Sequence, residues 1–116
     1  MIIKLETLVK DYGAARALDG LDLEVAEGSL YAFLGPNGAG KTTTIRILNG
    51  LAALPSGVAR IAGVDIAREP HRVKHLCGLV AQGNNLDGEL TVFENLEFHG
   101  RLYALPRRQR RDRAAL

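Results

Sequence analysis

One nine-residue stretch, residues 35–43, constrains this chain more than any other feature. It reads Gly-Pro-Asn-Gly-Ala-Gly-Lys-Thr-Thr and fits the pattern G-x-x-x-x-G-K-[ST], in which a glycine-rich loop cradles phosphate groups. The apolar run at residues 30–34 predicts a buried strand before the loop. Residues 42–48 predict a helix after it, ended by Asn49-Gly50. The pattern therefore lies between a strand end and a helix start, where its chemistry requires it.

The physical chemistry of this loop favours a bound polyphosphate. A helix start offers unpaired N–H groups and the positive end of the helix dipole, and glycines let the backbone curl so that N–H groups point inward. We expect Lys41 to reach the β- and γ-phosphates, the Thr42 hydroxyl to bind Mg²⁺, and Thr43 to bond a phosphate oxygen. A glycine-rich turn without a ligand is the much less favoured alternative. The expected nucleotide-binding residues of the loop are Gly35, Pro36, Asn37, Gly38, Ala39, Gly40, Lys41, Thr42 and Thr43.

The composition is that of an ordinary soluble globular domain. The chain has 116 residues, of which 47% are hydrophobic and 24% charged. No apolar run approaches the ~18 residues of a membrane span, and the first residues lack the basic start and long apolar core of a signal peptide. The single cysteine, Cys77, excludes a disulfide framework within the chain. These features predict a cytoplasmic protein.

Positive charge is concentrated at the C-terminal end. Residues 101–116 hold six of the fifteen basic residues and one acidic residue, Asp112. Such a cluster attracts nucleic acid or an anionic membrane surface, the latter at ~1 kcal/mol per basic residue, or it is simply the solvated face of a helix. Because no aromatic residue is interleaved for base stacking among the arginines at residues 107–113, we expect no nucleic-acid partner, and we favour the solvated face.

Hydrophobic periodicity and turn residues predict alternating strands and helices. Thr91 and Glu94 form a capping box that marks one helix start, and Pro55 lies in an expected loop at residues 51–56. The expected strands cover residues 3–9, 21–25, 30–34, 57–63, 64–66 and 77–81, and the expected helices residues 42–48, 69–75, 92–104 and 107–116.

Two further residues are candidates for ligand contact. Gln82 follows the apolar run at residues 77–81, and a polar side chain at the tip of a buried strand lies where open α/β sheets bind ligands. Tyr12 lies on a predicted turn, where its ring can stack on an adenine or pack against its own hairpin. Spacing alone favours packing against the hairpin.

Together these residues resemble the first half of the nucleotide-binding domain of an ATP-binding-cassette (ABC) transporter. Residues 35–43 are similar to the family's Walker A motif, Tyr12 to its adenine-stacking aromatic residue, and Gln82 to its Q-loop glutamine. The resemblance reverses the interpretation of Tyr12. It also implies that Gln82 contacts Mg²⁺ or the attacking water and couples the site to a membrane subunit. Residues 83–96 look most like ATPase subunits of multidrug or antibiotic exporters of the daunorubicin-resistance type.

The resemblance implies an α/β fold: a P-loop NTPase core with an antiparallel β subdomain in residues 1–82 and the start of a helical subdomain in residues 83–116. The resemblance therefore implies a partial, truncated domain over residues 1–116. In the family the signature motif, the Walker B strand with its Mg²⁺-binding Asp and catalytic Glu, and the switch His all come later in the sequence.

The implied function is ATP and Mg²⁺ binding in the ATPase subunit of an exporter. Such a subunit pairs with a second nucleotide-binding domain and lies on the inner face of the cell membrane through a permease partner. Two alternatives remain open. One is a soluble ABC ATPase that acts in translation or DNA repair, and the other is a truncated product without catalytic turnover.

Overall fold

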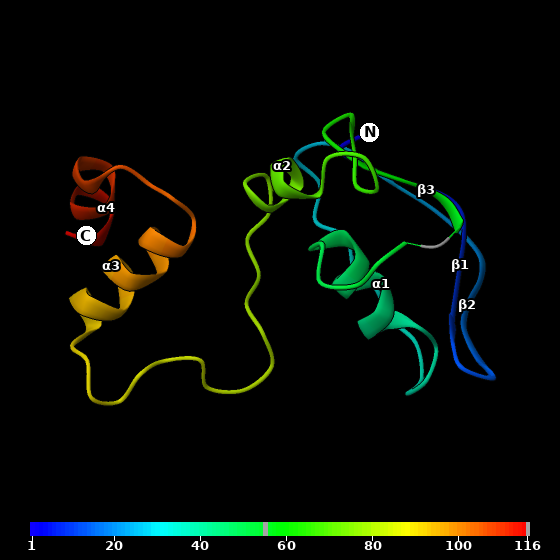
Figure 1. Ribbon diagram of the computed structural model, residues 1–116, viewed down its shortest axis with the longest axis horizontal. Coiled ribbons are helices and arrows are strands. Elements are labelled where there is room, and N and C mark those ends of the chain that lie inside the picture. The colour runs from blue at the N-terminus through cyan, green and yellow to red at the C-terminus, as the bar shows by residue number, and fades with distance from the viewer. Residues whose placement is uncertain (55, 116) are drawn as a thin grey trace. The chain divides into compact units, whose positions relative to one another are not determined.

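The computed structural model describes residues 1–54 and 56–115, and it divides into two compact units, Met1–Gly78 and Leu79–Leu116. The first unit holds a β-sheet with two helices, and the second holds a pair of helices (Figure 1). The unit boundary falls four residues before the subdomain boundary expected after residue 82, and that subdomain assignment stays a prediction.

The sheet of the first unit has four antiparallel strands in the order β2-β1-β3-β4. They are β1 (Ile3–Tyr12), β2 (Ala15–Val25), β3 (Ser56–Ile61) and β4 (Val64–Asp65). The hairpin of β1 and β2 is longer than predicted, because the strands pair from Ile3 with Val25 up to Tyr12 with Ala15. This extension places Tyr12 at the end of a strand, beside a two-residue turn.

Two helices pack on this sheet: α1 (Lys41–Leu48) lies against β2, and α2 (Pro70–Lys74) lies against β4. Both were predicted from the sequence and are confirmed. Pro70 is the first residue of α2. Proline is tolerated at this position because the N–H that it lacks would have no acceptor within the helix. Strand and helix side chains together make one core, which comprises Leu5, Leu8, Leu18, Ile47, Leu48, Ala59, Ile61, Val64, Ile66 and Val73.

The second unit is built on α3 (Val92–Leu102) and α4 (Arg107–Ala114), which pack on each other. The predicted capping box is present: the Glu94 N–H donates to the Thr91 hydroxyl at 3.2 Å, and the Thr91 N–H donates to the Glu94 carboxylate at 2.8 Å. The Thr91 N–H and, at 2.8 Å, the Thr91 hydroxyl both donate to the Glu94 carboxylate, and these two bonds lower the pKa of Glu94. The stabilisation they give is therefore present above the unfolded pKa of this carboxyl and is lost as the pH falls through its folded value.

Two predicted strands, residues 30–34 and 77–81, are wrong. Both segments lack strand structure, and Leu30, Leu34 and Val80 are almost fully exposed. A continuous apolar run forms a strand only when neighbouring strands accept its backbone hydrogen bonds and other layers cover both its faces. The four described strands pair only with one another, so these runs have no neighbour in the sheet. The expected loop residue Pro55 and the expected final helical residue Leu116 lie outside the described residues.

A bulge in β1 shapes the centre of the sheet. Thr7 has φ = 50°, and its N–H donates to the Asp22 carboxylate of β2 at 2.7 Å instead of joining the ladder. On the other side, a Cβ added to Gly57 of β3 would lie 2.5 Å from the Thr7 carbonyl oxygen, and Gly57 itself has φ = 92°. Only glycine fits this close crossing.

We therefore expect Gly57→Ala to lower the free energy of unfolding by roughly 2–4 kcal/mol, because left-handed backbone strain adds to a backbone overlap. Gly63→Ala is the matched control: its φ is 78° but no atom lies within 4 Å of an added Cβ, so only about 1 kcal/mol of backbone strain is expected. Urea unfolding of both variants measures the difference. Equal losses in the two variants would contradict the close crossing at Thr7.

Candidate nucleotide-binding site

The phosphate loop leads directly into α1. The helix begins at Lys41, and its N-cap, Gly40, provides no side-chain cap. The first N–H groups of α1 therefore have no acceptor within the helix, and its first turn contains no acidic residue that would repel an anion. Residues 35–39 are exposed. This arrangement leaves the positive end of α1 open toward solvent, as an anion site requires.

Glycines set the path of the loop. Gly38 and Gly40 have φ values of 83° and 89°, which side chains with a Cβ rarely adopt. A Cβ on Gly40 would lie 2.6 Å from the Ala17 carbonyl oxygen and 2.6 Å from Leu18 Cδ2. The loop thus touches the backbone of β2 at Gly40, and this contact fixes the start of α1 against the hairpin.

The Lys41 side chain folds back across the loop. Its ammonium donates hydrogen bonds to the carbonyl oxygens of Gly35 and Pro36, the latter at 2.6 Å. The loop is also closed by the Ala39 N–H, which donates to the Pro36 carbonyl at 3.2 Å. An ammonium group carries three hydrogens, so two bonds to the loop leave one for a phosphate oxygen. The predicted phosphate-contacting charge is therefore held beside the curled backbone.

The three threonines that follow Lys41 differ in burial. Thr42 is exposed and Thr43 half-buried, whereas Thr44 is 1% exposed and its hydroxyl donates to the Gly40 carbonyl at 2.9 Å. Thr44 thus anchors α1 to the loop. The exposed Thr42, in the first turn of α1, is free to act as a ligand, as the sequence predicts.

Tyr12 lies on the hairpin that touches the loop. Tyr12 pairs with Ala15 of β2. Ala17, whose carbonyl oxygen approaches Gly40, lies two positions after Ala15, which is about 7 Å along the strand. The ring is 47% exposed, and the Lys10 ammonium lies 5.2 Å from its centroid. The first unit therefore brings Tyr12 and the loop together, with ring surface left for an aromatic ligand.

Gln82 belongs to the second unit and is exposed at a bend, in the irregular segment before α3. The predicted site residues are thus divided: Tyr12 and residues 35–43 lie in the first unit and Gln82 in the second.

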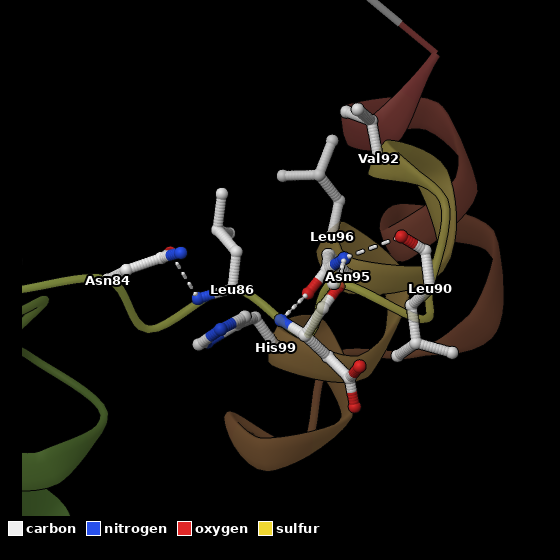
Figure 2. Close-up of a pocket in the computed structure, with 9 residues that line it drawn as sticks. Asn84, Leu86, Leu90, Val92, Asn95, Leu96 and His99 are labelled. Carbon is white, nitrogen blue, oxygen red and sulfur yellow. Dashed lines mark hydrogen bonds between the residues drawn. The ribbon is translucent and has the colours of Figure 1, made fainter.

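Asn95 organises the second unit, a role that sequence analysis missed. It is 7% exposed. Its side-chain oxygen accepts from the Asp87 N–H at 2.9 Å, and its side-chain nitrogen donates to the carbonyls of Asp87, Leu90 and Thr91 at 3.0–3.2 Å (Figure 2). The signal in the sequence was an asparagine in the first turn of an otherwise amphipathic helix, where it is disfavoured unless its side chain bonds nearby backbone.

The loop that Asn95 holds forms one wall of an apolar pocket of about 330 Å³. Leu86, Leu90 and Leu96 line this pocket, and His99 lies at the same pocket (Figure 2). The complete lining is Asn84, Leu86, Asp87, Gly88, Leu90, Val92, Asn95, Leu96 and His99. The pocket begins two residues after Gln82 in the sequence.

Comparison with known proteins identifies the family. The family model described as "ABC transporter" matches residues 18–116. The chain belongs to this family. It is 49% identical over 112 residues to the daunorubicin resistance ATP-binding protein DrrA2 of Streptomyces coeruleorubidus, and 43% identical over 105 residues to the Nod factor export ATP-binding protein I of Ralstonia nicotianae. These alignments cover 97% and 90% of this chain but 35% and 33% of those proteins.

Solved structures show the same fold. An ATP-binding subunit of an ABC transporter has a TM-score of 0.79 and 29% identity, over 92% of this chain and 45% of that one. A dimeric, post-hydrolysis ATP-binding cassette bound to ADP and Pi has a TM-score of 0.77 and 27% identity, over 97% of this chain and 54% of that one. The predicted α/β class and the family resemblance are confirmed, and this ABC chain spans about a third of the length of the curated relatives. None of the helices in the described residues has the length and apolar character to cross a membrane.

For Asn95→Ala we expect faster amide hydrogen exchange at Asp87, on the order of tenfold to a hundredfold, because the loop loses four hydrogen bonds to one buried side chain. Asn84→Ala is the control, since Asn84 is exposed and accepts one bond, from the Leu86 N–H at 3.0 Å. If exchange at Asp87 rises equally in both variants, Asn95 does not hold this loop.

Proposed function

We propose that this chain binds Mg-ATP through residues 35–43 as the nucleotide-binding part of the ATPase subunit of an ABC exporter. The observation that carries the proposal is the geometry of the loop: Lys41 held across a curled glycine-rich backbone at the open start of α1. In this arrangement Lys41 contacts the β- and γ-phosphates, and the N–H groups after Gly38 and Gly40 bind phosphate oxygens.

The residues present fit both magnesium and adenine. Thr42 supplies an exposed hydroxyl in the first turn of α1, which is the ligand that this motif offers to Mg²⁺, and Thr43 adds a hydroxyl for a phosphate oxygen. Tyr12 stacks on adenine from the hairpin that touches Gly40. Bound Mg²⁺ would neutralise phosphate charge. By resemblance to the family's Q-loop glutamine, Gln82 would contact the metal or the attacking water.

Export is proposed from the relatives, whose names refer to drug resistance and to export of Nod factor. We propose that the chain acts with a second nucleotide-binding domain and a membrane permease, and that it lies on the cytoplasmic face of the membrane through that permease. The apolar pocket that follows Gln82 is a surface of the second unit suited to a permease segment, because it is concave and apolar and is bordered by the loop that Asn95 bonds.

Replacing Lys41 tests the phosphate assignment. Lys41→Ala removes a charge-assisted contact worth about 1.5–3 kcal/mol, so we expect affinity for a fluorescent ATP analogue to fall roughly 10- to 150-fold. Lys74→Ala removes an equal charge from the exposed end of α2 and is expected to change affinity little. Equal affinity of the Lys41 variant and the unchanged protein would rule out this site.

Tyr12 variants test the adenine contact separately. We expect Tyr12→Ala to weaken binding of the same analogue about tenfold, because one stacking ring is lost. Tyr12→Phe keeps the ring and the cation–π contact with Lys10, and is expected to bind almost as well as the unchanged protein. A Phe variant as weak as the Ala variant would show that stacking is not the role of this residue.

A further inference from the structure

Helix α4 carries a cluster of arginines that the nucleotide site does not use. Arg107, Arg108 and Arg111 are all exposed, and their spacing of three and four residues makes them neighbours on one side of the helix. We call these three residues the basic face. The adjoining Arg110 has a different role: its guanidinium donates to the Leu105 carbonyl at 2.7 Å and lies 3.7 Å from the Glu97 carboxylate. Arg110 therefore holds α4 to α3, and the basic face is left for solvent or a partner.

The charge of the basic face is poorly neutralised within the described residues. Asp112, the sole acidic residue of α4, lies 3.9 Å from Arg108, and the two side chains are 71% and 94% exposed, so this pair contributes little. Arg107 and Arg108 also occupy the first turn of α4, which has no acidic residue, although the helix dipole favours acidic residues there. Arg107 and Arg111 repel each other at a spacing of four. An anionic layer beside the basic face would relieve these unfavourable interactions.

The shape of the basic face favours an extended anionic surface over a small ligand. The apolar pocket of the second unit is lined by residues between 84 and 99 and by none of α4, and the three arginines of the basic face are exposed on the helix surface. A row of phosphodiester headgroups offers many acceptors at one plane and can rearrange around such a helix. Described residues 104–115 include no aromatic residue to stack on bases, which makes nucleic acid the poorer match.

We propose that the basic face binds anionic lipid headgroups directly, in addition to any contact with a permease. Each arginine near an anionic bilayer contributes about a fivefold gain in partitioning, so the three together give on the order of a hundredfold. The attraction is electrostatic and falls within a Debye length. The proposal is independent of nucleotide binding, because no residue of the basic face belongs to the loop at residues 35–43.

The test is co-sedimentation of the purified 116-residue chain with vesicles that contain no protein. Vesicles of phosphatidylcholine with 30% phosphatidylglycerol are compared with pure phosphatidylcholine, in about 0.1 M and 0.5 M salt. The variant Arg107→Gln/Arg108→Gln/Arg111→Gln removes the basic face. The control Arg60→Gln/Arg68→Gln/Arg72→Gln removes the same charge from exposed positions of the first unit, and replacement of the three α4 arginines by lysine keeps the charge.

We expect the unchanged chain to bind the anionic vesicles in low salt, and to bind neither pure phosphatidylcholine nor the anionic vesicles in high salt. The α4 glutamine variant is expected to bind the anionic vesicles on the order of a hundredfold more weakly. The first-unit control and the lysine variant are expected to keep this binding. Equal losses in the two glutamine variants would overturn the proposal, because net charge alone would then explain binding. Tighter binding to a single-stranded oligonucleotide than to the anionic vesicles, at equal phosphate concentration, would replace lipid with nucleic acid as the partner. Binding of the ATP analogue by the same samples shows separately whether the proposed nucleotide site is intact.

Discussion

The contact between Gly40 and the backbone of β2 is the constraint on which the site depends. The phosphate loop approaches the hairpin so closely at Gly40 that a residue with a Cβ would overlap the backbone of β2. Because Tyr12 ends β1 of the same hairpin and α1 starts at the next residue after Gly40, this close approach fixes the lysine and the open helix start against the hairpin that carries Tyr12. The core around Leu18 and Ile47 then holds α1 to the sheet at this distance.

Two apolar segments add little to this core: Cys77 packs against it, but Leu30, Leu34 and Val80 are almost fully exposed. Residues 30–34 lead into the phosphate loop, and residues 77–81 lead to Gln82. A strand that precedes a phosphate loop normally fixes the loop from behind. In this chain that support comes from the contact with β2 and from the bond between Thr44 and Gly40. The exposed leucines of these runs form apolar surface that is prone to association.

The second unit is ordered in a different way, since none of its described apolar side chains is fully buried. Asn95 ties the loop at residues 87–91 to α3 through its side-chain amide. Arg110 packs along Gly100, where a Cβ would lie 2.8 Å from the arginine Cγ, and bonds the connection between the helices. Polar side chains thus hold together a small unit that has both the pocket and the basic face on its surface.

The sequence by itself determined the phosphate loop, α1, the capping box of α3 and the strands of the sheet. These depend on local chemistry: glycine conformational freedom, helix caps, turn residues and hydrophobic period. It also determined the family, because Tyr12, residues 35–43 and Gln82 occur at the family's spacing. Only the tertiary structure decided that residues 30–34 and 77–81 are not strands, because strand formation requires neighbours that a local pattern does not reveal. The roles of Gly57, Asn95 and Arg110 were likewise decided by partners distant in sequence or by burial, which composition and spacing do not specify.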